Sequence, residues 1–336
     1  MVRSVNNNRK GKILGDQSGV ALVLAVGIVA LLTVVALEFQ RFNVLQVALA
    51  SNFESSIEAL GIARSGIQVA LSLLDEDAQE NTSDSFFDAW GNLEESIEDV
   101  KSLFPDAEWE LKVTPVNAWL NINKLVDEKG KFVAAQKDLW LRILGSGDLL
   151  IGDAEPEDIL NSIKDWIDPD DEPTGFGAEE DYYLGLPEPY HCKNAPLTTV
   201  DELLMIKGIT PELFYGDKEH IGLRQIVAVY GSGKINLNVA PPHLIKVLSP
   251  EIDEDMVDEL IRFREDISHR DDLNNPGWYK NVPGWGTLKL PQELITVTSE
   301  YFKVKSVAKV RYSTKVTEAI VHRTKSAIKI IYWQTF

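Results

Sequence analysis

The sequence from Val20 to Leu37 reads VALVLAVGIVALLTVVAL, eighteen residues without a charge. As an α-helix rising 1.5 Å per residue, this stretch would span about 27 Å, close to the ~30 Å hydrocarbon core of a bilayer. Four basic residues and one acidic residue precede it, which under the positive-inside rule predicts a cytoplasmic N-terminus. The stretch therefore predicts a single membrane-spanning helix.

Other interpretations of this stretch fit less well. A secretory signal peptide normally has an apolar region of 7–15 residues that ends at a small-residue cleavage site. Here the apolar block is longer, and Glu38 and Arg41 follow it without an A-x-A pattern. A buried core helix would leave the basic leader without a purpose. A plain membrane anchor stays open on this segment alone.

The helical pattern continues beyond the apolar block. Apolar residues recur every three or four positions as far as Leu71, and residues 20–104 contain no proline. We therefore expect one long helix over residues 20–74, apolar in its first part and amphipathic in its second.

Composition limits the classes of function. The chain has 336 residues, 33 Lys and Arg against 52 Asp and Glu, and a formal net charge of −19. This balance argues against nucleic-acid binding by phosphate neutralisation, which needs a basic face. The single cysteine, Cys192, excludes an intrachain disulfide and a cysteine-based zinc site.

Strand signals bracket a long helical region. Residues 109–114 alternate between apolar and polar, residues 119–126 predict a second strand, and residues 135–265 are mostly helical in pattern. From Leu294 onward, apolar and polar residues again alternate with the period of two that is typical of a strand. We expect these residues to share one face of a strand: Phe302, Val304, Ala308, Val310 and Tyr312. Further strands are expected at 319–321 and 327–333, so the fold class is α+β with a large helical insertion.

The sequence also makes predictions about the burial of an acidic segment and of three aromatic residues. Residues 75–101 are acidic and polar, which predicts a surface loop with a short helix. Trp278, Tyr279 and Trp285 could line a groove, but such residues more often cover a core beneath a long loop.

The junction before the apolar block resembles the class III leader of type IV pilin-like proteins. In that family a prepilin peptidase cuts after a glycine, which here is Gly19, and the mature chain would begin at Val20. Most members carry a glutamate at the fifth mature position, where this chain has Leu24. A subunit without that carboxylate cannot pair with a neighbour's α-ammonium, which suits the end of a fibre better than its shaft.

Further motifs resemble the K-type minor pseudopilin of type II secretion (general secretion pathway protein K), the family that lacks this glutamate. They are residues 165–173, 177–183, 194–197, 200–203 and 234–241. The resemblance implies a prepilin-type leader at 1–19, a transmembrane and stem helix at 20–74, a pilin-like domain at 75–134 and 294–336, and an inserted helical domain at 135–293.

The same resemblance implies a structural function. The expected role is that of a minor pseudopilin at the tip of the type II secretion pseudopilus. The chain would span the bacterial inner membrane once, with its C-terminal domain in the periplasm and an N-methylated mature terminus. Expected partners are the prepilin peptidase and the other minor pseudopilins, and we hypothesise contact with secreted substrates.

An acidic loop in the insertion is a candidate calcium site. Asp168, Asp170, Glu179 and Asp181 lie around a short loop that contains proline and glycine. Ca²⁺ accepts six to eight oxygen ligands in flexible geometry, whereas Mg²⁺ demands a stricter octahedron. The resemblance favours Ca²⁺, because the K-type family binds calcium in this domain. A solvated acidic loop is the alternative.

Two other functional classes remain. Residues 199–211 resemble a helix-hairpin-helix module, which would suit a membrane-anchored protein for DNA uptake. Acidic residues beside its hairpin, Asp201, Glu202 and Glu212, would repel phosphate, so a packing unit is favoured. An anchored hydrolase would need a catalytic constellation, and the five scattered histidines contain no H-E-x-x-H pattern. We expect no enzymatic activity.

Overall fold

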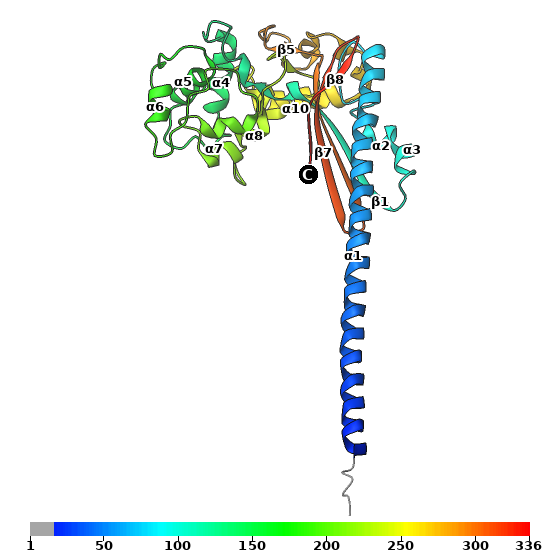
Figure 1. The fold of residues 1–336 in the computed structure, drawn as a ribbon. Coiled ribbons are helices and arrows are strands. Elements are labelled where there is room, and N and C mark those ends of the chain that lie inside the picture. The colour runs from blue at the N-terminus through cyan, green and yellow to red at the C-terminus, as the bar shows by residue number, and fades with distance from the viewer. Residues whose placement is uncertain (1–16) are drawn as a thin grey trace, which may run out of the picture. The chain divides into compact units, whose positions relative to one another are not determined.

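The structure is a computed structural model that describes residues 17–336, so the expected leader lies almost wholly outside the described residues. The chain divides into two compact units, residues 1–58 and 59–336, which are described separately. Helix α1, Gln17–Glu80, contributes residues to both units (Figure 1).

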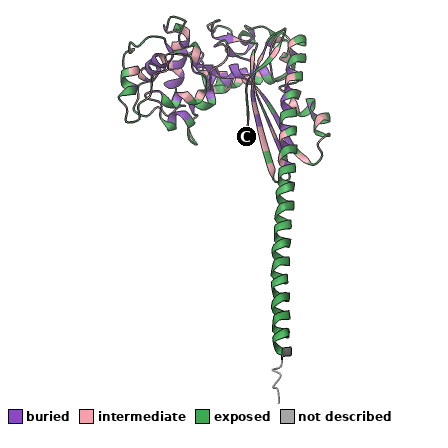
Figure 2. Cartoon of the chain, in the orientation of Figure 1, coloured by how far each residue is buried: buried purple, intermediate pink, exposed green. Residues whose placement is uncertain are grey.

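The part of α1 in the first unit is exposed along its length. Every residue from Gly19 to Ala50 is exposed, including the whole apolar block (Figure 2). This helix is long and apolar enough to cross a membrane, by length and composition, and it is the one such helix in residues 17–336. Leaving so many apolar side chains in water costs about 2 kcal/mol each, so a lipid or protein environment must cover them.

The part of α1 in the second unit packs on a sheet. Its buried residues recur every three or four positions, as expected for one face of a helix: Ala59, Ile62, Ala63, Ile67, Ala70 and Leu74. The helix ends at Glu80, six residues beyond the predicted end of the stem.

Four antiparallel strands form the sheet in the order β1-β6-β7-β8. They are β1 Ala107–Pro115, β6 Tyr301–Val310, β7 Ser313–Arg323 and β8 Ile328–Thr335. Alternate residues of β6, among them Phe302, Val304 and Ala308, are fully buried in the core shared with α1. Because β1 and β6 are neighbours, the chain from 116 to 300 leaves and re-enters the sheet between adjacent strands (Figure 1).

The intervening chain has its own core beneath many short elements. The α-helices after α1 are α2 Leu93–Ser96, α3 Glu98–Lys101, α4 Ala134–Leu144, α5 Pro156–Ile167, α6 Glu180–Leu184, α7 Pro211–Tyr215, α8 Leu223–Ile226, α9 Pro242–Lys246 and α10 Glu254–Glu265. The 3₁₀ helices are η1 Val116–Ala118, η2 Ile122–Lys124, η3 Val200–Met205, η4 Ile267–His269, η5 Asp272–Asn274 and η6 Trp278–Asn281. Two-residue parallel pairs join β2 Leu120–Asn121 to β3 Val227–Ala228 and β4 Ile235–Asn236 to β5 Ile295–Thr296.

The predicted α+β class with a long N-terminal helix and an antiparallel sheet is confirmed. Trp278, Tyr279 and Trp285 are at most 1% exposed and belong to the core, so they do not line a groove.

Three local expectations are wrong. Residues 119–126 form only the two-residue strand β2, because the Asn121 side chain accepts a hydrogen bond from the Asn123 N–H and begins the 3₁₀ turn η2. Tyr312 does not share the buried face of β6 but lies 95% exposed in the turn after it. Residues 75–101 are not all at the surface: Asp77, Asp84 and Asp88 are buried.

One glycine permits the close approach of α1 to the sheet. A Cβ added at Gly66 would clash with the Ser306 Oγ and lie 2.9 Å from the Trp109 Nε1, two atoms that are hydrogen-bonded to each other. A Cβ at Gly61, one and a half turns earlier, would meet nothing within 4 Å.

We predict that Gly66→Ala destabilises the fold, although alanine is intrinsically the better helix former by about 1 kcal/mol. Overpacking at such a contact typically costs 1–3 kcal/mol, which should lower the melting temperature by several degrees. Gly61→Ala is the control and should leave it unchanged or slightly higher. Equal melting temperatures for the two variants would contradict the close packing of α1 on the sheet.

Candidate metal centre

The candidate centre lies where α5 ends and α6 begins. Helix α5 starts with Pro156 at its first position and buries an apolar face that includes Ile163 and Trp166. Asp165 lies in its last turn, Asp168 caps its C-terminus, and Glu179 caps the N-terminus of α6. The loop between α5 and α6 thus brings Glu179 back beside Asp165 and Asp168.

Three carboxylates meet at this point. Oxygens of Asp165, Asp168 and Glu179 all lie within 4.8 Å of one another, and the residues are only 0%, 1% and 4% exposed. Within residues 17–336, the ion pairs recorded for this cluster involve one cation, Lys164, which contacts Asp168 and lies 3.7 Å from Asp165. Three buried carboxyl groups therefore face one cationic side chain.

Several of these oxygens lack a protein partner. The Thr174 N–H donates to both oxygens of Asp165, at 3.1 and 3.0 Å. The Oδ1 of Asp168 and both carboxylate oxygens of Glu179 are buried without a hydrogen-bond partner in the described part of the chain. Burial, followed by repulsion from Asp165 and Asp168, raises the pKa of Glu179 to about 8. Buried polar atoms are normally satisfied, so these unpaired oxygens make the cluster a candidate for binding a cation.

The oxygen-only donor set fits a hard divalent cation. Ca²⁺ is coordinated by carboxylates and backbone carbonyls at 2.3–2.6 Å, and a divalent ion would offset the excess negative charge. The backbone follows the cluster closely, since a Cβ added at Gly177 would clash with the Asp165 Oδ2. The loop is therefore built tightly around these carboxylates.

The structure brings together two of the four residues expected from the sequence. Asp168 and Glu179 belong to the cluster, whereas Asp170 and Asp181 are exposed and lie outside it. Asp170 instead accepts a hydrogen bond from the Glu172 N–H. Asp181 shares an outer hollow with Glu179.

Asp165 is not among the residues expected from the sequence. The signal that could have found it is its spacing from Asp168, because residues three apart near a helix end share one face. Whether Ca²⁺ binds any of these residues stays a prediction.

The helix-hairpin-helix-like segment is engaged in packing. Gly208 adopts a left-handed conformation with φ of +85° between η3 and α7. The Lys207 Nζ donates to the carbonyls of Phe176 and Gly177, at 2.9 and 3.1 Å. The Lys207 ammonium, which a phosphate would otherwise contact, is therefore hydrogen-bonded to the loop of the candidate centre.

Comparison with known proteins shows a similarity to one family over part of the chain. Residues 118–219, less than half of the chain, match the family model described as type II secretion system (T2SS), protein K. Type II secretion system protein K of Pectobacterium carotovorum subsp. carotovorum is 26% identical over 189 residues, which cover 53% of this chain and 54% of that protein. The matched part of the chain is therefore similar to type II secretion protein K.

Two further proteins of that family show the same partial match. The family's proteins from Aeromonas hydrophila and Klebsiella pneumoniae are 25% and 24% identical, over 53% and 59% of this chain. The matched part spans about half the length of these relatives, 53% and 60%.

The fold is similar to one chain in the crystal structure of the GspK-GspI-GspJ complex from the enterotoxigenic Escherichia coli type 2 secretion system. The TM-score is 0.62 with 16% sequence identity, over 87% of this chain and 99% of that one.

Cys192 borders the candidate centre and should be unreactive. Its Sγ lies 3.7 Å from the carbonyl oxygen of Asp165, and burial raises the pKa of its thiol to about 12. Since the thiolate is the nucleophile, we predict alkylation by a maleimide at pH 8 about 100-fold slower than for free cysteine. Reaction of the unfolded chain in urea is the control. Labelling at the same rate in the native and unfolded states would contradict the buried environment.

Proposed function

We propose that the chain is a minor pseudopilin at the tip of the type II secretion pseudopilus, a structural component for protein export across the outer membrane. The observation that carries this proposal is helix α1. Its first part is apolar from Val20 to Leu37 and exposed from Gly19 to Ala50, and its second part buries one face against the sheet from Ala59 onward. One helix therefore offers an apolar surface to lipid or to other helices and also anchors a folded domain.

The proposed placement follows from the charges around the apolar block. The basic leader would remain in the cytoplasm until the prepilin peptidase cuts between Gly19 and Val20, and the mature terminus would be methylated. The chain would then span the inner membrane once, with the sheet and the inserted elements in the periplasm.

Leu24 supports a place at the tip. Its position, fifth after the proposed cleavage, carries no carboxylate that could neutralise a neighbour's terminal ammonium. A charge left unpaired in lipid costs several kcal/mol, so this subunit is suited to a site that needs no such pairing. The proposed partners are the other minor pseudopilins, by analogy with the solved complex in which GspK is assembled with GspI and GspJ. Contact with secreted substrates remains part of the hypothesis.

The alternative of a DNA-uptake protein is not favoured. Glu202, within the helix-hairpin-helix-like segment, accepts a hydrogen bond from Lys193 at 2.5 Å, and the Lys207 ammonium donates to two backbone carbonyls. The basic groups near Gly208 are thus already engaged.

The partner proposal predicts complex formation by the full chain in detergent with the I- and J-type minor pseudopilins of the same organism. Phe53 is 68% exposed on α1, so Phe53→Lys should weaken co-purification at least tenfold if apolar stems pack together. Asn52→Lys adds the same charge at a neighbouring exposed polar position and should have little effect. Failure of the wild-type chain to co-purify, or an equal loss in both variants, would contradict the proposal.

We also propose that Asp165, Asp168 and Glu179 bind Ca²⁺. At free calcium about 100 times the dissociation constant, the folded state should gain about 2.7 kcal/mol, and the melting temperature should rise by several degrees. Asp165→Asn and Glu179→Gln should abolish this rise, whereas Asp181→Asn should retain it.

Differential scanning fluorimetry and calorimetric titration of the full chain in detergent measure both effects. The absence of calcium binding by the wild-type chain, or loss of the rise in Asp181→Asn alone, would contradict the assignment of these three ligands.

A further inference from the structure

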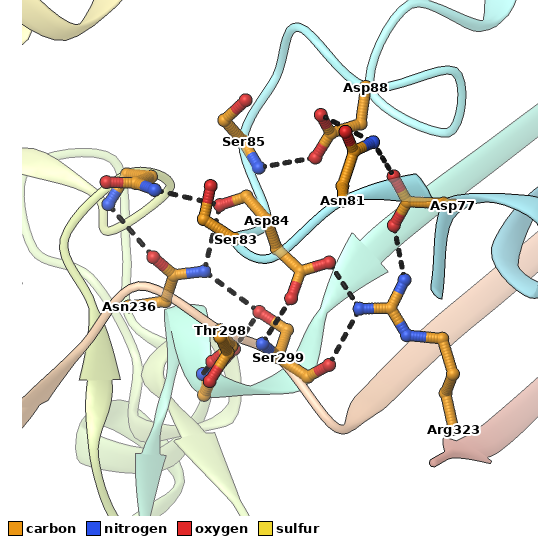
Figure 3. Close-up of polar contacts among 12 residues, drawn as sticks. Asp77, Asn81, Ser83, Asp84, Ser85, Asp88, Asn236, Thr298, Ser299 and Arg323 are labelled. Carbon is orange, nitrogen blue, oxygen red and sulfur yellow. Dashed lines mark hydrogen bonds and ion pairs between the residues drawn. The ribbon is translucent and has the colours of Figure 1, made fainter. Parts of the chain in front are cut away.

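A second group of buried carboxylates lies at the C-terminal end of α1, where Figure 3 shows its contacts. Asp77 lies in the last turn of α1, and Asp84 and Asp88 follow in the loop before α2. Their oxygens also lie within 4.8 Å of one another, and the three residues are 2–4% exposed.

Arg323, the last residue of β7, neutralises part of this charge. Its Nη1 contacts Asp77, and its Nη2 contacts Asp84 and donates to the Ser299 carbonyl at 3.0 Å (Figure 3). The guanidinium is 4.5 Å from the centre of the Phe302 ring and is buried. This group thus differs from the candidate metal centre, because an arginine bonds to two of the three carboxylates.

The same loop holds the inserted elements to the sheet. The Asp84 carbonyl accepts hydrogen bonds from the side-chain amides of Asn236 and Asn238, at 3.1 and 3.2 Å. Its carboxylate accepts the Ser299 N–H at 2.5 Å, and its own N–H donates to the Val297 carbonyl at 2.8 Å. Asp84 therefore joins three parts of the chain: the end of α1, the end of the sheet and the β4 region of the insertion.

We call this meeting point of the end of α1, the end of the sheet and the β4 region the joint. The joint carries an excess of negative charge. Asp88 accepts the Ser85 N–H at 2.7 Å and the Asn81 amide at 3.5 Å, and no ion pair is recorded for it in residues 17–336. The hollow that Asp77 and Asp88 line also includes Glu76 and Glu80 of α1 and Glu95 of α2, with Arg270 as the basic residue of that lining. Asp77 and Asp84 share Arg323.

We propose that Asp77, Asp84, Asp88 and Arg323 form a proton-sensitive clamp that holds the joint between α1, the sheet and the inserted elements more tightly at acidic than at neutral pH. Protonation of one aspartate reduces the repulsion among the three carboxylates to that of one remaining pair, while Arg323 keeps its bonds to the remaining charges. Deprotonation restores the repulsion and favours local opening of the loop from Thr82 to Asn92.

The direction of the effect follows from linkage. Burial raises the pKa of Asp88 to about 7 and also raises the pKa of Asp84. A carboxyl group whose pKa is higher in the folded than in the unfolded state stabilises the fold most at pH values below its ordinary pKa of about 4. This stabilisation is lost as the pH rises towards 7.

Hydrogen exchange of the full chain in detergent, corrected for the intrinsic pH dependence of exchange, tests the clamp. We expect protection of the amides in residues 82–92 to fall about tenfold between pH 5.5 and 7.5, since one proton is released on opening. Amides of α10, which lies outside the cluster, serve as the internal reference and should change much less.

Asp88→Asn mimics the protonated residue and should keep residues 82–92 protected at pH 7.5 as they are at pH 5.5. Asp99→Asn removes an exposed carboxylate of α3 and should retain the wild-type pH dependence. Protection that is equal at the two pH values in the wild-type chain, that falls equally in α10, or that keeps its pH dependence in Asp88→Asn would overturn the proposal.

Discussion

The structure depends on one constraint, namely that a single helix must satisfy two different surroundings. Residues 20–37 of α1 present apolar side chains on every side, whereas residues from Ala59 onward bury one face against the sheet. The first pattern is stable only where lipid or other apolar helices cover it, and the second only where a folded domain does. In the proposed role, the element that fixes the chain to a membrane is therefore the same one that contributes a buried face to its core.

The pairing of β1 with β6 explains how the sheet can form although residues 116–300 separate these two strands. β1 and β6 are antiparallel neighbours, and Pro115 at the end of β1 pairs with Phe302 near the start of β6. The chain between them therefore leaves and re-enters the sheet at the same end of this strand pair. The joint around Asp84 and Arg323 then ties this segment to the end of α1 (Figure 3). Buried ion pairs contribute little net stability, but they penalise alternative arrangements that would leave a charge unpaired.

Patterns local in sequence could be predicted, and contacts between distant residues could not. The apolar block, the helical period after it and the alternation in β6 each reflect one element, so the sequence alone indicates them. Arg323 is 246 and 239 residues from the two aspartates it binds, so nothing in the acidic segment indicates that Asp77 and Asp84 are buried. At the candidate metal centre, counting charges in the loop favoured exposed Asp170 and Asp181 over Asp165, because burial within a helix end has no compositional signal.

The proposed role requires α1 to be a processed membrane stem, and mass spectrometry of the mature N-terminus of the full chain from its native membrane tests this most directly. We predict a chain that begins at Val20 with a methylated α-amine. A chain that begins at Met1, or one cut after Leu37, would contradict the proposed role.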